Sequence, residues 1–142
     1  MTAAHTSLRG WLRHLAASDR LAAIRPGVAL EHELAAIAKR LDGRQASLFP
    51  RPSGHPIPVV SGFMSQRSWI AEAMGVPEAR LLQQFRAAAE KPLAWREVDE
   101  AVAPVQQIVH RFEDGDGDIR ALLPVPTHSE HDHGAYITAG LV

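Results

Sequence analysis

Three aspartates at alternate positions form the first arrangement in the sequence that could do chemistry. Asp114, Asp116 and Asp118 lie in a glycine-rich stretch, and alternate carboxylates of this kind wrap Ca²⁺ in an EF-hand loop. Such a loop also needs a glycine at its sixth position and a glutamate at its twelfth. The sequence has Ile119 and Val125 at those positions, so the pattern favours a solvated acidic loop over a calcium site.

Three histidines and an aspartate gather in a second arrangement near the end of the sequence. His128, His131, Asp132 and His133 carry imidazole and carboxylate groups, which ligate Zn²⁺ or another divalent metal. Zinc sites usually draw their ligands from two distant segments, and the remaining histidines are scattered. Two interpretations stay open here: a structural metal site, or a polar loop between two domains.

Motifs for nucleophilic catalysis and phosphate binding give no stronger signal. The sequence has no cysteine, no Gly-x-Ser-x-Gly elbow and no glycine-rich phosphate loop. Residues 61–65 lead into a predicted helix whose N-terminus could bind an anion, although a capped helix explains them equally well. Ser65 and Ser68 are interpreted as residues that cap or decorate that helix. The glutamates of the predicted helices are interpreted as solvated, namely Glu31, Glu33, Glu72 and Glu78.

The composition bounds the class of protein. The chain has 142 residues, 46% of them hydrophobic and 22% charged, with a formal net charge of -1. This indicates a globular chain without a basic face, so a nucleic acid is not expected as a partner. Residues 1–10 lack the apolar region of a signal peptide, and no apolar run approaches the roughly 18 residues that span a bilayer. We therefore expect a cytoplasmic protein that has no membrane partner.

Helices that alternate with short strands must position these side chains. Apolar residues at helical spacing, with caps and glycine stops, predict helices over residues 7–18, 30–41, 66–74 and 77–90. Short apolar runs predict strands over residues 21–24, 46–49, 59–60, 105–110 and 136–142. This alternation predicts an α/β fold built of α+β layers. We expect one α/β domain over residues 1–112, and a linker with the start of a second, incomplete domain over residues 113–142.

The order of these segments resembles the N-terminal portion of UbiD-family decarboxylases. The segments that carry the resemblance are Ser7–Leu12, Asp19–Leu21, Ala46–Phe49, Pro58–Val60, Ser65–Arg67, Ala73–Gly75 and Ala103–Val109. The most specific part comes last, where Asp118–Pro126, His128 and Asp132–Gly140 resemble the stretch that enters the family's flavin-binding domain. One departure is His133, which stands where the family has a small residue.

The resemblance implies a fold and an activity. The fold would be a UbiD-like α/β domain followed by the first strand of a split β-barrel that binds the flavin. The activity would be reversible, non-oxidative decarboxylation of aromatic, heteroaromatic or α,β-unsaturated carboxylic acids. The implied cofactors are prenylated FMN, a divalent metal (Mn or Mg) and potassium. The flavin would carry the chemistry, while the protein supplies orientation and proton transfer.

The resemblance implies few site residues in this chain. Thr138, Ala139 and Gly140 match the family strand whose threonine approaches the flavin, so we expect these three residues to contact the cofactor. The family's catalytic residues and metal ligands match positions further along than Val142, so no catalytic residue and no metal ligand is assigned.

Three hypotheses about function remain at this stage. The first is the front part of a decarboxylase, which would bind a small-molecule carboxylic acid and form a homo-oligomer. In that case its partner is the rest of the decarboxylase chain or a complementary subunit. The second is a non-catalytic assembly or interaction subunit of a split UbiD-like complex. The third is a small metal-binding protein built on the histidine loop.

Overall fold

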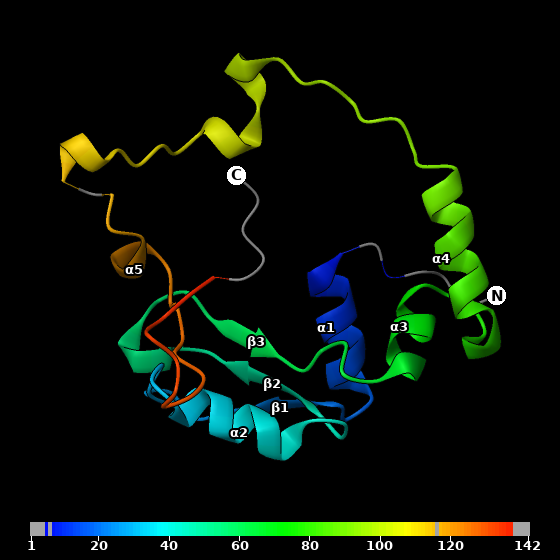
Figure 1. Ribbon diagram of the computed structural model, residues 1–142, viewed down its shortest axis with the longest axis horizontal. Helices are drawn as coiled ribbons and strands as arrows, with labels where there is room; N and C mark the ends of the chain where they lie inside the picture. The colour runs from blue at the N-terminus through cyan, green and yellow to red at the C-terminus, as the bar shows by residue number, and fades with distance from the viewer. Residues whose placement is uncertain (1–4, 6, 116, 138–142) are drawn as a thin grey trace.

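The computed structural model describes residues 5, 7–115 and 117–137. Its centre is a three-stranded sheet in the order β1 (Leu21–Ala23), β2 (Ala46–Phe49) and β3 (Val59–Ser61). β1 runs parallel to β2, and β3 runs antiparallel to it. Figure 1 shows α2 (Glu33–Leu41) alongside the sheet, and α1 (Leu8–Ala17) with α3 (Arg67–Ala73) grouped at one end of it. The mixed α/β architecture predicted from the sequence is confirmed for this part of the chain.

Local sequence accounts for α1. Ser7 is its N-cap, and the Ser7 hydroxyl accepts a hydrogen bond from the backbone N–H of Gly10 at 3.1 Å, which satisfies one of the helix's free donors. The apolar residues at helical spacing place Trp11 and Leu15 on the buried face. The predicted helix is confirmed with its cap.

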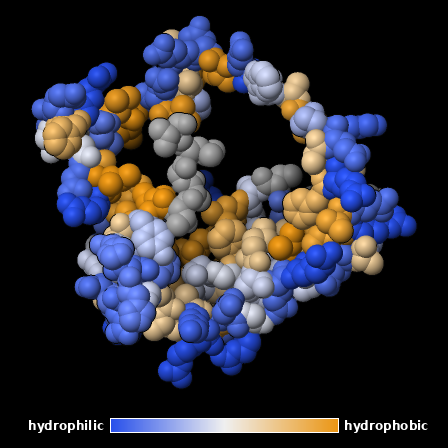
Figure 2. Space-filling view, in the orientation of Figure 1, coloured by the Kyte–Doolittle hydropathy of each residue, from blue (hydrophilic) through white to orange (hydrophobic). Residues whose placement is uncertain are grey.

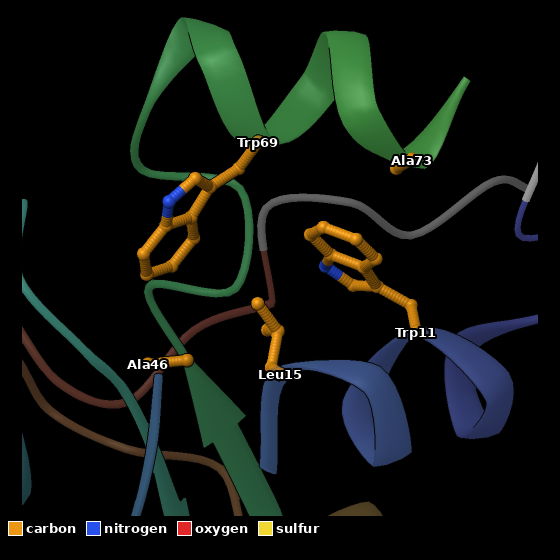
Figure 3. Close-up of a cluster of buried hydrophobic side chains, with 5 residues drawn as sticks. All are labelled: Trp11, Leu15, Ala46, Trp69 and Ala73. Atoms are coloured by element: carbon orange, nitrogen blue, oxygen red, sulfur yellow. The ribbon is translucent and has the colours of Figure 1, made fainter. Parts of the chain in front are cut away.

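Two small clusters of apolar side chains form the core, one at each end of β2. Figure 3 shows the first, in which Trp11 and Leu15 of α1 meet Trp69 and Ala73 of α3 beside Ala46. The second cluster lies under α2 and consists of Val28, Leu34 and Phe49. Since β2 contributes to both clusters, it connects the α1–α3 end of the molecule to the α2 end.

We call residues 7–90 the body, and the helices in its second half agree with the predicted ones except for one cap. The helix predicted from Ser65 begins at Arg67, and its N-cap is Gln66, so the interpretation of Ser65 as the cap is wrong. The prediction of a helix from Pro77 onward is confirmed in outline. It consists of a 3₁₀ turn, Glu78–Arg80, that runs into α4, Leu81–Glu90.

A long arm follows α4, and we use this name for residues 91–115. Figure 1 shows the arm leaving α4 and looping back to α5. It contains three short 3₁₀ turns, Glu100–Val102, Pro104–Gln106 and Phe112–Asp114. The strand predicted over residues 105–110 is therefore wrong. Its β-branched residues are exposed, and among the described residues the sheet contains only β1, β2 and β3.

The return segment, residues 117–137, brings the chain back to α2. It begins with the one-turn helix α5, Ile119–Leu122, capped by Asp118. A final strand was predicted over residues 136–142. Tyr136 and Ile137 are not in a strand, and the remainder of that prediction lies outside the described residues. Within the described ranges, none of the helices has the length and apolarity needed to cross a membrane.

Candidate functional site

The return segment is joined to the start of α2 by main-chain hydrogen bonds, and we call this junction the seam. The N–H of Thr127 donates to the carbonyl of Leu30 at 3.2 Å, and the N–H of His32 donates to the carbonyl of Thr127 at 2.9 Å. Glu31 and Thr127 form an isolated parallel bridge. His55 Nε2 adds a contact of 3.1 Å to the carbonyl of Ala121. The seam therefore fixes the path of the return segment at Ala121 and Thr127.

The seam also explains why α2 begins later than predicted. The sequence predicts a helix from Leu30, but the observed helix begins at Glu33 because residues 30–32 are paired with Thr127. His32 has φ 61° and ψ -39°, a backbone conformation that L-residues rarely adopt. Glu33 stabilises this start, since its carboxylate accepts from the N–H of Ala29 at 2.8 Å and pairs with Arg25 at 2.9 Å.

A cavity of about 520 Å³ lies where α2 faces the return segment. Its walls carry two imidazoles, an ammonium and a carboxylate, beside two alanines. The lining residues are His32, Ala35, Ala36, Lys39, His128 and Glu130. The cavity thus combines a residue of the histidine loop with groups from α2.

The histidine loop itself is organised around Asp132. The Asp132 carboxylate accepts hydrogen bonds from the backbone N–H groups of His128 at 3.1 Å and Ser129 at 2.9 Å. The His128 and Tyr136 rings lie 6.0 Å apart, centroid to centroid. In the part of the chain that the structure describes, no three His, Asp or Glu side chains converge as metal ligands. A metal therefore does not fit this loop in its present arrangement.

In the acidic loop, the Asp118 carboxylate likewise has a structural use. Asp118 accepts from the backbone N–H of Arg120 at 3.0 Å and pairs with the Arg120 side chain at 3.3 Å. Hydrogen bonding by the Arg120 side chain, followed by its backbone N–H, lowers the pKa of Asp118. Asp114 lies in a 3₁₀ turn, and Asp116 lies outside the described residues. Asp118 thus begins a helical turn.

The most densely connected charged group joins α1 to α3. Arg20 donates to Glu72 through Nη1 at 2.6 Å and Nη2 at 2.9 Å. His14 Nε2 lies 2.7 Å from Oε1 of the same carboxylate, and it must carry a proton to bond there because a carboxylate only accepts. The Arg20 guanidinium also lies 5.5 Å from the Trp69 ring centroid, within the range of a cation–π contact. The interpretation of Glu72 as a solvated residue is wrong.

This arrangement suits a structural role rather than proton transfer. The Arg20 hydrogen bonds, with a smaller contribution from His14, lower the pKa of Glu72 to about 2. A carboxylate held so far below neutral pH is a weak base and stays ionised. No sequence signal pointed to this group, because Arg20 and Glu72 are 52 residues apart along the chain.

Residues 61–65, the candidate anion-binding stretch, line a cavity of about 480 Å³ with Ala38, Lys39 and Asp42. Lys39 would favour an anion there, whereas Asp42 would oppose it. The predicted cofactor contacts Thr138, Ala139 and Gly140 lie outside the described residues.

Residues 12–89 match the model of the 3-octaprenyl-4-hydroxybenzoate carboxy-lyase N-terminal domain. Among curated proteins, the chain is 34% identical over 98 residues to a gallate decarboxylase of Lactiplantibacillus plantarum. It is 33% identical over 134 residues to an uncharacterized protein in the cooM 5′ region of Rhodospirillum rubrum. These matches cover 68% and 90% of this chain, but 20% and 27% of the relatives.

Two solved structures of the UbiD-class enzyme HmfF from Pelotomaculum thermopropionicum are similar to the chain. An evolved dimeric form in complex with prenylated FMN (prFMN) has a TM-score of 0.83 at 39% identity, covering 96% of this chain and 31% of HmfF. A complex with FMN has a TM-score of 0.82 at 39% identity, covering 93% of this chain and 29% of HmfF. The chain thus spans less than a third of each of these relatives.

Proposed function

Since the chain belongs to the UbiD family and corresponds to its N-terminal portion, we propose that it is the N-terminal part of a reversible, non-oxidative decarboxylase. Its substrates would be aromatic, heteroaromatic or α,β-unsaturated carboxylic acids, and CO₂ would leave as a proton takes its place. Residues 1–112 would form the α/β domain, and residues 113–142 would lead into a split β-barrel that holds the flavin.

The seam is the observation that carries this proposal. It holds Thr127 against the start of α2 by main-chain hydrogen bonds, and this anchors the stretch whose sequence resembles the entry to a flavin-binding domain. The similarity to HmfF supports the same conclusion, because it extends over 96% of this chain. A fixed exit path would orient the following strand toward a cofactor.

The cofactor would be prenylated FMN, which supplies the electron sink for decarboxylation when it is bound. We propose that Thr138, Ala139 and Gly140 contact it. The divalent metal (Mn or Mg) and the potassium ion are assigned to the polypeptide that completes the enzyme, because the described residues do not gather three ligands. Our proposal includes assembly of the completed enzyme into a homo-oligomer.

A second candidate function is a non-catalytic assembly subunit of a split complex. The exposed apolar arm favours an interaction role of this kind. In that case the chain would bind a complementary subunit without contributing to the flavin site.

A chimera distinguishes the two functions. Residues 1–142 would replace the matched part of HmfF, and the protein would be loaded with prenylated FMN. We expect CO₂ release from members of a panel of aromatic, heteroaromatic and α,β-unsaturated acids, and faster flavin loss in the Thr138→Val chimera. HmfF itself is the positive control. A folded, flavin-loaded chimera that releases no CO₂, and loses flavin equally with and without the substitution, would support the non-catalytic alternative.

A further inference from the structure

Two residues before α1, His5 and Ser7, tie the start of the chain to both helices of the first core cluster, and we call these two residues the strap. The backbone N–H of His5 donates to the carbonyl of Ala73 at 2.8 Å, and Ala73 is the last residue of α3. Carbonyls in the last turn of a helix lack a partner within the helix, so this bond completes α3. Ser7 caps α1 in turn. The strap therefore joins the end of one helix to the start of another.

The strap forms one wall of a small cavity. This cavity has a volume of about 230 Å³, and its other walls are apolar residues of α1 and of the loop before α3. The lining residues are His5, Ser7, Leu8, Trp11, Phe63 and Met64. Figure 2 shows hydrophobic residues over the α1–α3 end of the molecule, where Leu8 is 50% exposed and Trp11 only 2%. Release of the strap would thus uncover an apolar surface next to Trp11.

The side chain of the strap packs against a second imidazole. The His5 ring centroid lies 4.6 Å from that of His14 and 5.2 Å from that of Trp11. The Trp11 and His14 rings are themselves stacked at 5.4 Å. Imidazole is the side chain whose ordinary change of charge falls between about pH 5 and pH 8. The strap is therefore held on α1 through two ionisable rings in contact.

The charges around these rings are unbalanced toward the positive side. Arg20 Nη2 lies 3.1 Å from His14 Nε2, and Glu72 Oε1 lies 2.7 Å from it. Residues 61–65, which lead into α3 beside the cavity, contain no ionisable side chain. One carboxylate, already bound to the guanidinium through both oxygens, thus faces a permanent cation and two imidazoles. Whichever imidazole takes the first proton, the second would become charged beside it, and like charges this close repel.

We propose that the strap is a pH-sensitive latch, which closes on α1 and α3 at neutral pH and opens in mildly acidic solution. The closed strap accommodates a proton on one imidazole, whereas the open strap separates His5 from His14 and accommodates a proton on each. Because the open form binds more protons, its population rises as the pH falls through the range in which imidazoles ionise. The opened latch uncovers the cavity next to Trp11. This inference is independent of the decarboxylase proposal, since it uses contacts within the α1–α3 end alone.

Hydrogen exchange of the His5 amide, followed by NMR spectroscopy of residues 1–142, tests the latch. This amide is bonded to Ala73 in the closed form, so its protection, corrected for the intrinsic effect of pH, reports the fraction of open strap. We expect the ratio of open to closed strap to rise roughly tenfold from pH 7.5 to pH 5, as repulsion between partly exposed charges allows. Glu72 stays ionised over this range, because its pKa is lowered to about 2. Equal protection at the two pH values would overturn the inference.

Two variants separate the latch from a general effect of acid. His5→Phe keeps an aromatic ring against α1 but cannot be charged, so its amide should show no such rise. His14→Gln keeps a donor for Glu72 and removes the other charge, and it decides the matter if phenylalanine is not accommodated at position 5. The control is His131→Gln, an exposed histidine outside this cluster, which should retain the wild-type response. A response that persists in His14→Gln, or that is lost in His131→Gln, would overturn the inference.

Discussion

The guanidinium of Arg20 engages both oxygens of the Glu72 carboxylate, at 2.6 Å and 2.9 Å, and thereby links the turn after α1 to the last turn of α3. A two-point contact of this kind fixes orientation as well as distance. Because β1 follows Arg20 directly, the pair also sets where the sheet meets the α1–α3 helices.

Glu72→Gln tests this link. We expect a loss of about 1–2 kcal/mol in the free energy of unfolding, since the carboxylate accepts charged hydrogen bonds but is one-third exposed. Urea unfolding followed by circular dichroism measures it. The matched control is Glu78→Gln, because the Arg67–Glu78 contact is 3.9 Å long and more than half exposed. A loss as small as in that control would contradict the assignment.

The same pair predicts a pH dependence. The pKa of Glu72 is lowered from 4.5 to about 2 by the Arg20 and His14 contacts. Its stabilising contribution is therefore complete above pH 4.5, and it declines as the pH falls toward 2. The difference in unfolding free energy between the wild type and Glu72→Gln should be constant from pH 7 to pH 5 and shrink below that. A constant difference down to pH 3 would refute the prediction.

Trp11→Phe tests the first core cluster. The Trp11 side chain is 2% exposed, and its indole Nε1–H donates to the carbonyl of Phe63 at 2.8 Å. Phenylalanine would lose both volume and the donor, so we expect a cost of about 2–3 kcal/mol. Trp95→Phe in the exposed arm provides the control, with a change within about 0.5 kcal/mol. Equal changes in the two variants would argue against the core assignment.

Replacement of His32 tests whether the seam imposes backbone strain. His32→Gly should raise the free energy of unfolding by about 1 kcal/mol, because glycine adopts a positive φ without steric cost. His32→Ala removes the imidazole but keeps a Cβ, so it should show no gain. If both variants lose stability equally, the imidazole matters more than the backbone conformation.

The helices and strands of residues 8–90 could be predicted from the sequence because their signals are local. Ser7 caps α1, and apolar spacing marks its buried face. The start of α2 could not be predicted, since the pairing with Thr127 that delays it comes from the far end of the chain. The residues at 105–110 have strand propensity, but a strand forms only when a second strand satisfies its backbone groups.

The candidate site could be predicted only in part. The resemblance to UbiD proteins identified the family from the stretch around Leu122–Gly140. The resemblance does not indicate the Arg20–Glu72 pair. A glutamate in a predicted helix is expected to be solvated, and the partner that reaches Glu72 lies 52 residues away in the sequence. The carboxylates of Asp118 and Asp132 were recognised as possible ligands. In the fold they accept backbone N–H groups instead, which is the commonest use of aspartate at turns.

The seam has a consequence for how the chain folds. Its contacts join residues far apart in sequence, such as His55 and Ala121, which are separated by 66 positions. The longest loop that the seam closes, from Leu30 to Thr127, has 127 − 30 = 97 positions, against 52 between Arg20 and Glu72 and fewer within the sheet, so its closure costs more entropy. The body should therefore assemble first during refolding, and the return segment should attach to an already formed α2 in a later kinetic step.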